Sequence, residues 1–158
     1  MKAATLHQLK KEMVHLDPDQ LLKLCLRLAK FKKDNKELLT YLLFEAENEN
    51  GYIQTLKSAI DEQMEGINKS NLYVRRKGLR KVIRYLDKCI RYSGNKETEI
   101  EMRIYLCKKM VEHEMPIYRI NAFMNIYDGQ IKKVRTALSK LHEDLQYDYL
   151  EELKEIER

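Results

Sequence analysis

The sequence has few of the residues that build turns, and no tryptophan. Its 158 residues include five glycines and two prolines, so few breaks interrupt the chain. Hydrophobic residues make up 44% of the chain and charged residues 35%, a balance that excludes intrinsic disorder and suits amphipathic helices. We therefore expect an all-α protein in which residues 1–158 form a single all-helical domain.

Cysteine is also scarce. Cys25, Cys89 and Cys107 are odd in number and far apart, which excludes a disulfide framework and a CxxC metal site. Each lies in an apolar helical pattern, so we expect buried thiols in a reducing compartment. No apolar run approaches the ~20 residues of a membrane span, and the basic N-terminus lacks the apolar core of a secretory signal. These absences predict a soluble, cytoplasmic protein without a membrane partner.

Apolar residues recur with a helical period of 3.6 residues in about seven stretches. Asp17 is expected to cap a helix that begins at Pro18, and Gly94 to end another. Asn50 and Gly51 form an expected helix C-cap, and Gly129 is expected to break or kink the last stretch. The predicted helices cover residues 3–15, 18–33, 34–50, 53–68, 72–92 and 97–115, and the stretch from 117 onward.

Two of these stretches, residues 21–28 and 38–44, are apolar nearly all round. Such helices are normally covered on both sides, which predicts a central helical hairpin. Short turns between antiparallel helices suit either stacked helical hairpins, as in an α-α superhelix, or a compact up-down bundle. We slightly favour the stacked hairpins.

Charge is segregated along the chain, although the net charge is only +5. Residues 69–92 carry +8, whereas residues 41–68 and 143–158 each carry −5. With 100° between successive helical residues, seven cations of helix 72–92 fall within an arc of roughly 140°, opposite its apolar residues. Tyr73 lies in the same arc. The seven cations are Arg76, Lys77, Arg80, Lys81, Arg84, Lys88 and Arg91.

Like charges three or four residues apart on a helix repel one another, so an anionic partner would stabilise this basic face. Acidic residues of the chain itself could pair with it, namely Asp61, Glu62, Glu65 or those in 143–157, or solvent alone could cover it. Our leading hypothesis is a non-catalytic interaction module that presents the basic face to an acidic protein partner. The alternative is sequence-independent nucleic-acid binding through phosphate contacts, since no sequence-reading motif is present.

A second alternative concerns residues 131–156. Their apolar residues recur mostly at three- and four-residue steps, like a coiled-coil seam, which predicts a self-associating helix and a homodimer. Five tyrosines in the second half of the chain are expected at the rim of the core with their hydroxyls in water, or else in a binding groove. They are Tyr85, Tyr92, Tyr105, Tyr118 and Tyr127.

The sequence offers no specific sign of catalysis. One Glu-x-x-His match, Glu12 to His15, falls short of the paired motifs of di-iron bundles, and no phosphate-binding glycine loop occurs. The cysteines lie in apolar stripes, where thiols are inert. We expect no catalytic residue, metal or cofactor. The lack of a catalytic motif favours a protein that is not an enzyme.

Overall fold

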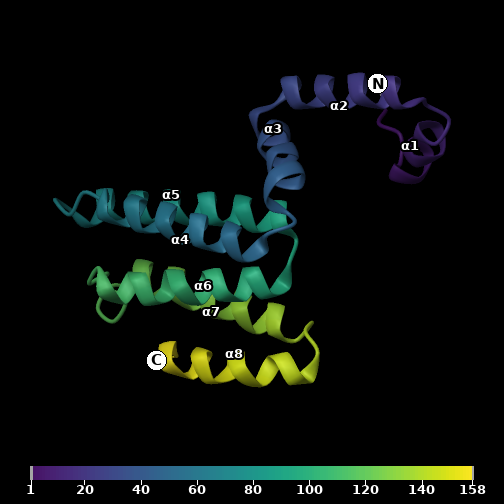
Figure 1. Ribbon diagram of the computed structural model, residues 1–158. Coiled ribbons are helices and arrows are strands. Elements are labelled where there is room, and N and C mark those ends of the chain that lie inside the picture. The colour runs from purple at the N-terminus through teal and green to yellow at the C-terminus, as the bar shows by residue number, and fades with distance from the viewer. Residues whose placement is uncertain (1, 158) are drawn as a thin grey trace. The chain divides into compact units, whose positions relative to one another are not determined.

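The computed structural model describes residues 2–157, and within them it contains helices and turns but no strand (Figure 1). The all-α prediction is confirmed, with eight α-helices among the described residues rather than about seven. A short π-helix, η1, lies between α3 and α4. The elements are α1 (Leu6–Met13), α2 (Pro18–Phe31), α3 (Lys33–Thr40), η1 (Tyr41–Glu45), α4 (Glu49–Glu65), α5 (Leu72–Ser93), α6 (Lys96–Glu112), α7 (Asn121–Leu138) and α8 (Glu143–Ile156).

Two predicted helix ends are confirmed. The Asp17 carboxylate accepts a hydrogen bond of 2.8 Å from the Gln20 amide, and the Gln20 side chain accepts one of 3.1 Å from the Asp17 amide, so that α2 begins at Pro18 with a reciprocal cap. Gly94 ends α5 with a φ of +67°, and its amide donates to the Ile90 carbonyl at 2.9 Å. Residues other than glycine rarely adopt this backbone conformation.

The predicted C-cap at Asn50 and Gly51 is wrong. Both residues lie in the first turn of α4, and the Asn48 side chain caps that helix by accepting a 3.0 Å hydrogen bond from the Gly51 amide. Asparagine is a strong N-cap residue, and here the N-cap preference of Asn48 prevailed over the turn tendency of Asn50 and Gly51. The preceding helix ends earlier, in η1.

The predicted break at Gly129 is also wrong. Helix α7 runs through Gly129 without interruption, and the chain turns instead between α7 and α8. A glycine within a helix costs about 1 kcal/mol, which the burial of neighbouring Tyr127, Gln130 and Val134 can offset. Residues 131–156 therefore belong to two helices and do not form one seam. Val134, together with Leu138, Leu153 and Ile156 of the same stretch, is buried within the chain.

The chain divides into two compact units, Met1–Phe44 and Glu45–Arg158. In the first unit, α2 packs against α3, yet no residue of α1, α2 or α3 is buried. The prediction that residues 21–28 and 38–44 are covered on both sides is thus wrong for the described chain. A unit of this size has too little chain to enclose two apolar helices, so several leucines and phenylalanines are exposed. The single-domain prediction is not tested.

In the second unit, α6 occupies the centre and contacts α4, α5, α7 and α8. Figure 1 shows α4 beside α5, α6 beside α7, and α8 on the far side of the α6 and α7 layer. This arrangement places α5 and α8 in different outer layers of the unit. The choice between stacked hairpins and a compact bundle stays a prediction. Fully buried side chains of this core include Leu56, Ile60, Leu79, Leu86, Ile100, Leu106, Met110 and Phe123.

Candidate interaction surface on helix α5

Helix α5 is held by caps at both ends and by one buried face. The Asn71 side chain accepts a 2.8 Å hydrogen bond from the Val74 amide at the N-terminus, and Gly94 closes the C-terminus. Leu79, Val82 and Leu86 are buried against the rest of the unit. The opposite face of α5 is therefore directed away from the core, as the 3.6-residue pattern predicted.

The predicted basic face lies on this outward side. Tyr73 is 67% exposed, and Arg76 and Lys88 are half-buried. The other five cations of the face are exposed. Within residues 2–157, every cation of the face except Lys88 lacks both an ion pair and a hydrogen-bond partner for its side chain. These unpartnered cations are Arg76, Lys77, Arg80, Lys81, Arg84 and Arg91.

Several of the acidic residues expected as internal partners contact cations outside the basic face. The Asp61 carboxylate accepts a 2.7 Å hydrogen bond from the Tyr105 hydroxyl and pairs with Lys109 at 3.3 Å. On α8, Glu152 and Glu155 both pair with Lys108 of α6 at 3.4 Å. Among the described residues, the six cations of the basic face other than Lys88 are thus left to solvent or to an outside partner.

A groove of about 410 Å³ adjoins the basic face, between the C-terminal end of α4 and α5. Gly78 lies on its α5 side, where a Cβ atom would come within 3.2 Å of the Ile67 side chain, so glycine permits the close approach of the two segments. The groove combines cationic, amide and apolar side chains. Its lining residues are Gln63, Gly66, Ile67, Asn68, Val74, Lys77, Gly78, Lys81, Val82 and Arg84.

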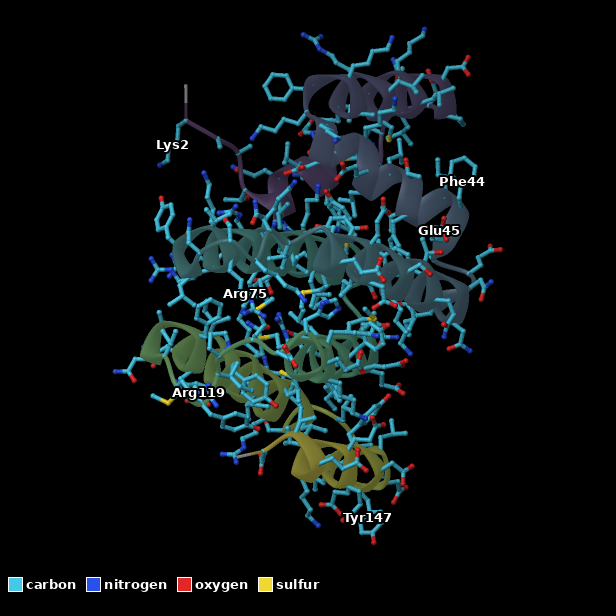
Figure 2. The ribbon with its side chains drawn as sticks, turned by 90° about the vertical axis from the view of Figure 1, so that its left-hand side faces the viewer. Lys2, Phe44, Glu45, Arg75, Arg119 and Tyr147 are labelled. Atoms are coloured by element: carbon cyan, nitrogen blue, oxygen red, sulfur yellow. The ribbon has the colours of Figure 1, made fainter. Side chains whose placement is uncertain are left out.

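Arg75 is a cation of α5 with a structural role that the sequence analysis missed. Its guanidinium Nη2 donates to the backbone carbonyls of His113 at 2.5 Å and Glu114 at 3.0 Å, just beyond the end of α6. Figure 2 labels Arg75 between the α4–α5 layer and the α6–α7 layer. The signal was available, because Arg75 precedes buried Leu79 by four residues and so shares its inward face.

A second missed residue, Arg103 of α6, connects α5 to its neighbours. It is 4% exposed and pairs with Asp87 of α5 at 2.8 Å and with Glu99 at 3.1 Å. The guanidinium also donates to the Gln130 side chain on α7 at 2.8 Å. A buried cation is stable only when its donors are satisfied, and these three acceptors lie on three different helices. The network therefore fixes α5 against α6 and α7 through the one acidic residue in α5, Asp87.

Three of the five tyrosines differ in their surroundings. Tyr118 is 68% exposed, whereas Tyr127 is buried and its hydroxyl donates to the Ile156 carbonyl at 2.6 Å, which corrects the prediction of a water-exposed hydroxyl there. The ammonium groups of Lys57 and Lys109 both lie over the Tyr105 ring, at 5.4 and 5.3 Å from its centroid. Burial and the hydrogen bond to Asp61 raise the pKa of the Tyr105 hydroxyl. None of these three tyrosines belongs to α5 or to its basic face.

Groups suited to catalysis or metal binding are not prominent in the described part of the chain. Within residues 2–157, no three or more His, Cys, Asp or Glu residues are grouped so that they could hold a metal ion. Burial raises the pKa of the Cys107 thiol to about 12, which keeps the thiol protonated at neutral pH.

No family model, curated protein or solved structure matches the chain. Over residues 2–157, no helix is long and apolar enough to cross a membrane.

Proposed function

We propose that the protein is a non-catalytic interaction module whose basic face on α5 binds an acidic segment of another protein. The main evidence for this proposal is that six neighbouring cations on this face lack an anionic partner among the described residues. Mutual repulsion of these cations disfavours the free state, and an acidic partner would relieve it.

The groove beside the face supports a protein partner over a nucleic acid. Lys77, Lys81 and Arg84 border a surface that also includes apolar Val74 and the amide of Asn68. An acidic peptide can place carboxylates on the cations and an apolar side chain in the groove. A phosphate backbone would use the cations alone. Nucleic acid remains the competing ligand in the test below.

A cytoplasmic location is part of the proposal. Cys25, Cys89 and Cys107 are all free, which suits a reducing compartment. Self-association is a further prediction, but residues 131–156 would not support it as one continuous helix.

The test compares two labelled probes by fluorescence anisotropy at about 50 mM salt, where charge-driven binding is strongest. One is a glutamate-rich peptide with a single leucine, and the other is a single-stranded oligonucleotide of equal charge. We expect the peptide to bind more tightly. The double variant Lys77→Glu/Lys81→Glu should lower its affinity at least about tenfold, which corresponds to 1.4 kcal/mol.

Lys132 and Lys140 provide the matched control, because both are exposed and neither has a side-chain partner among the described residues. Lys132→Glu/Lys140→Glu makes the same change of net charge away from α5 and should change the affinity less than about twofold. Equal losses in both double variants would contradict the proposal, as would tighter binding of the oligonucleotide.

A further inference from the structure

Helices α2 and α3 and the following residues 41–44 form an apolar groove in the first unit, and none of its lining residues belongs to the basic face of α5. The groove has a volume of about 600 Å³ and lies entirely within residues 26–44. Its apolar lining includes Leu26, Ala29, Leu39, Leu43 and Phe44. Leu43 is 64% exposed and Phe44 is 76% exposed, so large apolar side chains border a concave surface open to solvent. Contiguous exposed apolar surface of this kind marks interaction sites.

The rim of the groove is cationic. Four lysines line it, and no acidic residue does. Lys33 pairs with Glu37 at 3.5 Å, whereas the other three rim lysines have no side-chain partner within residues 2–157. The four are Lys30, Lys32, Lys33 and Lys36.

We propose that this groove binds an amphipathic helix with an acidic rim, contributed by a partner protein. An amphipathic helix presents apolar side chains at three- and four-residue steps, which can fill a hydrophobic groove between two helices. Carboxylates beside that apolar stripe would then meet the rim lysines. The apolar contacts supply most of the affinity, and the lysines select the sign of the partner's charge.

The same observations disfavour three other occupants. A membrane surface needs an apolar face that protrudes into the headgroups, whereas this surface is concave. A second copy would oppose one lysine rim with another, and residues 1–44 carry nine Lys or Arg against five Asp or Glu. A nucleic acid would leave the leucines and phenylalanines of the groove exposed to water.

Adjacent leucines provide a matched pair of variants. Leu43 lines this groove, whereas Leu42 lines a smaller pocket on the α2–α3 pair together with Cys25, Leu28 and Leu38. Leu42 is 55% exposed, so an aspartate at either position replaces a solvent-exposed side chain and leaves the buried residues untouched. Any difference between Leu43→Asp and Leu42→Asp reports on the groove.

The experiment uses the full chain and a labelled helical peptide of about 18 residues, with leucines on one face and glutamates beside them. We expect Leu43→Asp to lower the affinity measured by anisotropy at least about tenfold, and Leu42→Asp to lower it less than about twofold. Lys32→Glu/Lys36→Glu should weaken binding by about as much as Leu43→Asp. Lys10→Glu/Lys11→Glu, an equal change of charge on exposed residues of α1, should not.

Several outcomes would overturn the inference. Equal losses from Leu42→Asp and Leu43→Asp would mean that the groove is not the site. Failure of the peptide to bind, together with vesicle binding that Leu43→Asp abolishes, would identify a membrane with anionic lipid as the occupant. Failure of the peptide together with a dimer in sedimentation that Leu43→Asp abolishes would identify a second copy of the chain. If Lys77→Glu/Lys81→Glu removes the helical peptide and Leu43→Asp does not, the peptide binds on α5. That result overturns this inference and leaves the proposed function intact.

Discussion

Arg103 on α6 pairs with Asp87 on α5 across 2.8 Å, with only 5% of the arginine side chain exposed. The pair connects the helix that carries the basic face to the central helix of its unit. Asp87 also pairs with Lys133 of α7 at 3.0 Å, so one carboxylate joins three helices. The position of the basic face thus depends on a buried charge network behind it.

Replacing Arg103 with methionine should destabilise the protein by about 3 kcal/mol. The substitution keeps a long side chain but leaves Asp87, Glu99 and Gln130 short of a buried donor, and loss of one partner of a buried ion pair is costly. Urea unfolding at 25 °C measures the effect.

Arg135→Met is the control, because its pair with Glu157 at 2.7 Å is exposed on the arginine side and should contribute less than about 1 kcal/mol. Equal costs for the two variants would refute the structural importance of the buried network.

The same network predicts a loss of stability in acid. Burial alone would raise the pKa of the Asp87 carboxyl, but hydrogen bonds and charge from Lys133 and Arg103 outweigh it and lower the pKa. The pKa of Glu99 is lowered in the same way, against burial, by Lys96 and Arg103. A carboxyl with a lowered pKa in the folded state stabilises the protein fully above its unfolded pKa, and this stabilisation is lost as pH falls through the folded value.

Unfolding free energies should therefore decrease as pH falls below about 4.5, towards the lowered pKa values of these two carboxyls. Urea titrations at a series of pH values measure this decrease. In Arg103→Met the decrease should be shallower, since the charge that lowers both pKa values is absent. An identical pH dependence in the two proteins would show that other carboxyls control acid stability.

The three thiols should differ in reactivity. Cys89 and Cys107 are buried, and burial raises the pKa of Cys107 to about 12, whereas Cys25 is half-buried on α2. Since thiolate access controls thiol modification, a thiol-specific reagent should label Cys25 first in the native protein and the other two only on unfolding. Mass spectrometry of the labelled peptides distinguishes them. Rapid native labelling of Cys107 would contradict the packing of α6.

Gly94→Ala should cost about 1 kcal/mol in the free energy of unfolding. The cause is the φ of +67°, since no atom lies within 4 Å of the position that a Cβ atom would occupy. Gly129→Ala is the matched control within α7, where the space around the Cβ position is also open and alanine favours a helix. That substitution should stabilise the protein. Thermal unfolding should show a lower midpoint for Gly94→Ala and a higher one for Gly129→Ala, and shifts of the same sign would contradict the prediction.

Local chemistry made part of the fold predictable. Asp17 before Pro18 and Gly94 after a long amphipathic helix are signals whose causes lie within a few residues, and both gave correct helix ends. The outward direction of the α5 cations followed from the helical period of the buried leucines. By contrast, the predicted break at Gly129 was wrong. Burial of other α7 side chains offsets the free-energy cost of a glycine inside a helix, and that burial is not visible near Gly129 in the sequence.

The features that the sequence did not predict depend on contacts between residues far apart in the chain. Arg103 gives no local sign that it is buried, since its acceptors Asp87 and Gln130 are far away in the sequence. The apolar residues of α2 and α3 predicted cover on both sides, but the sequence does not say whether that cover comes from this chain. That six of the seven cations of the basic face lack a partner among the described residues likewise could not be known without the positions of Asp61 and the acidic residues of α8.

The most direct test of the central claim is a residue-resolved titration. Backbone amide spectra of the ¹⁵N-labelled full chain are recorded while the glutamate-rich peptide with a single leucine is added. We expect the largest shifts on α5 between Tyr73 and Arg91 and on Gln63 and Asn68, which line the adjoining groove. Largest shifts on α7 or α8 with α5 unchanged, or no shift at any peptide concentration, would contradict the assignment of the basic face as the binding surface.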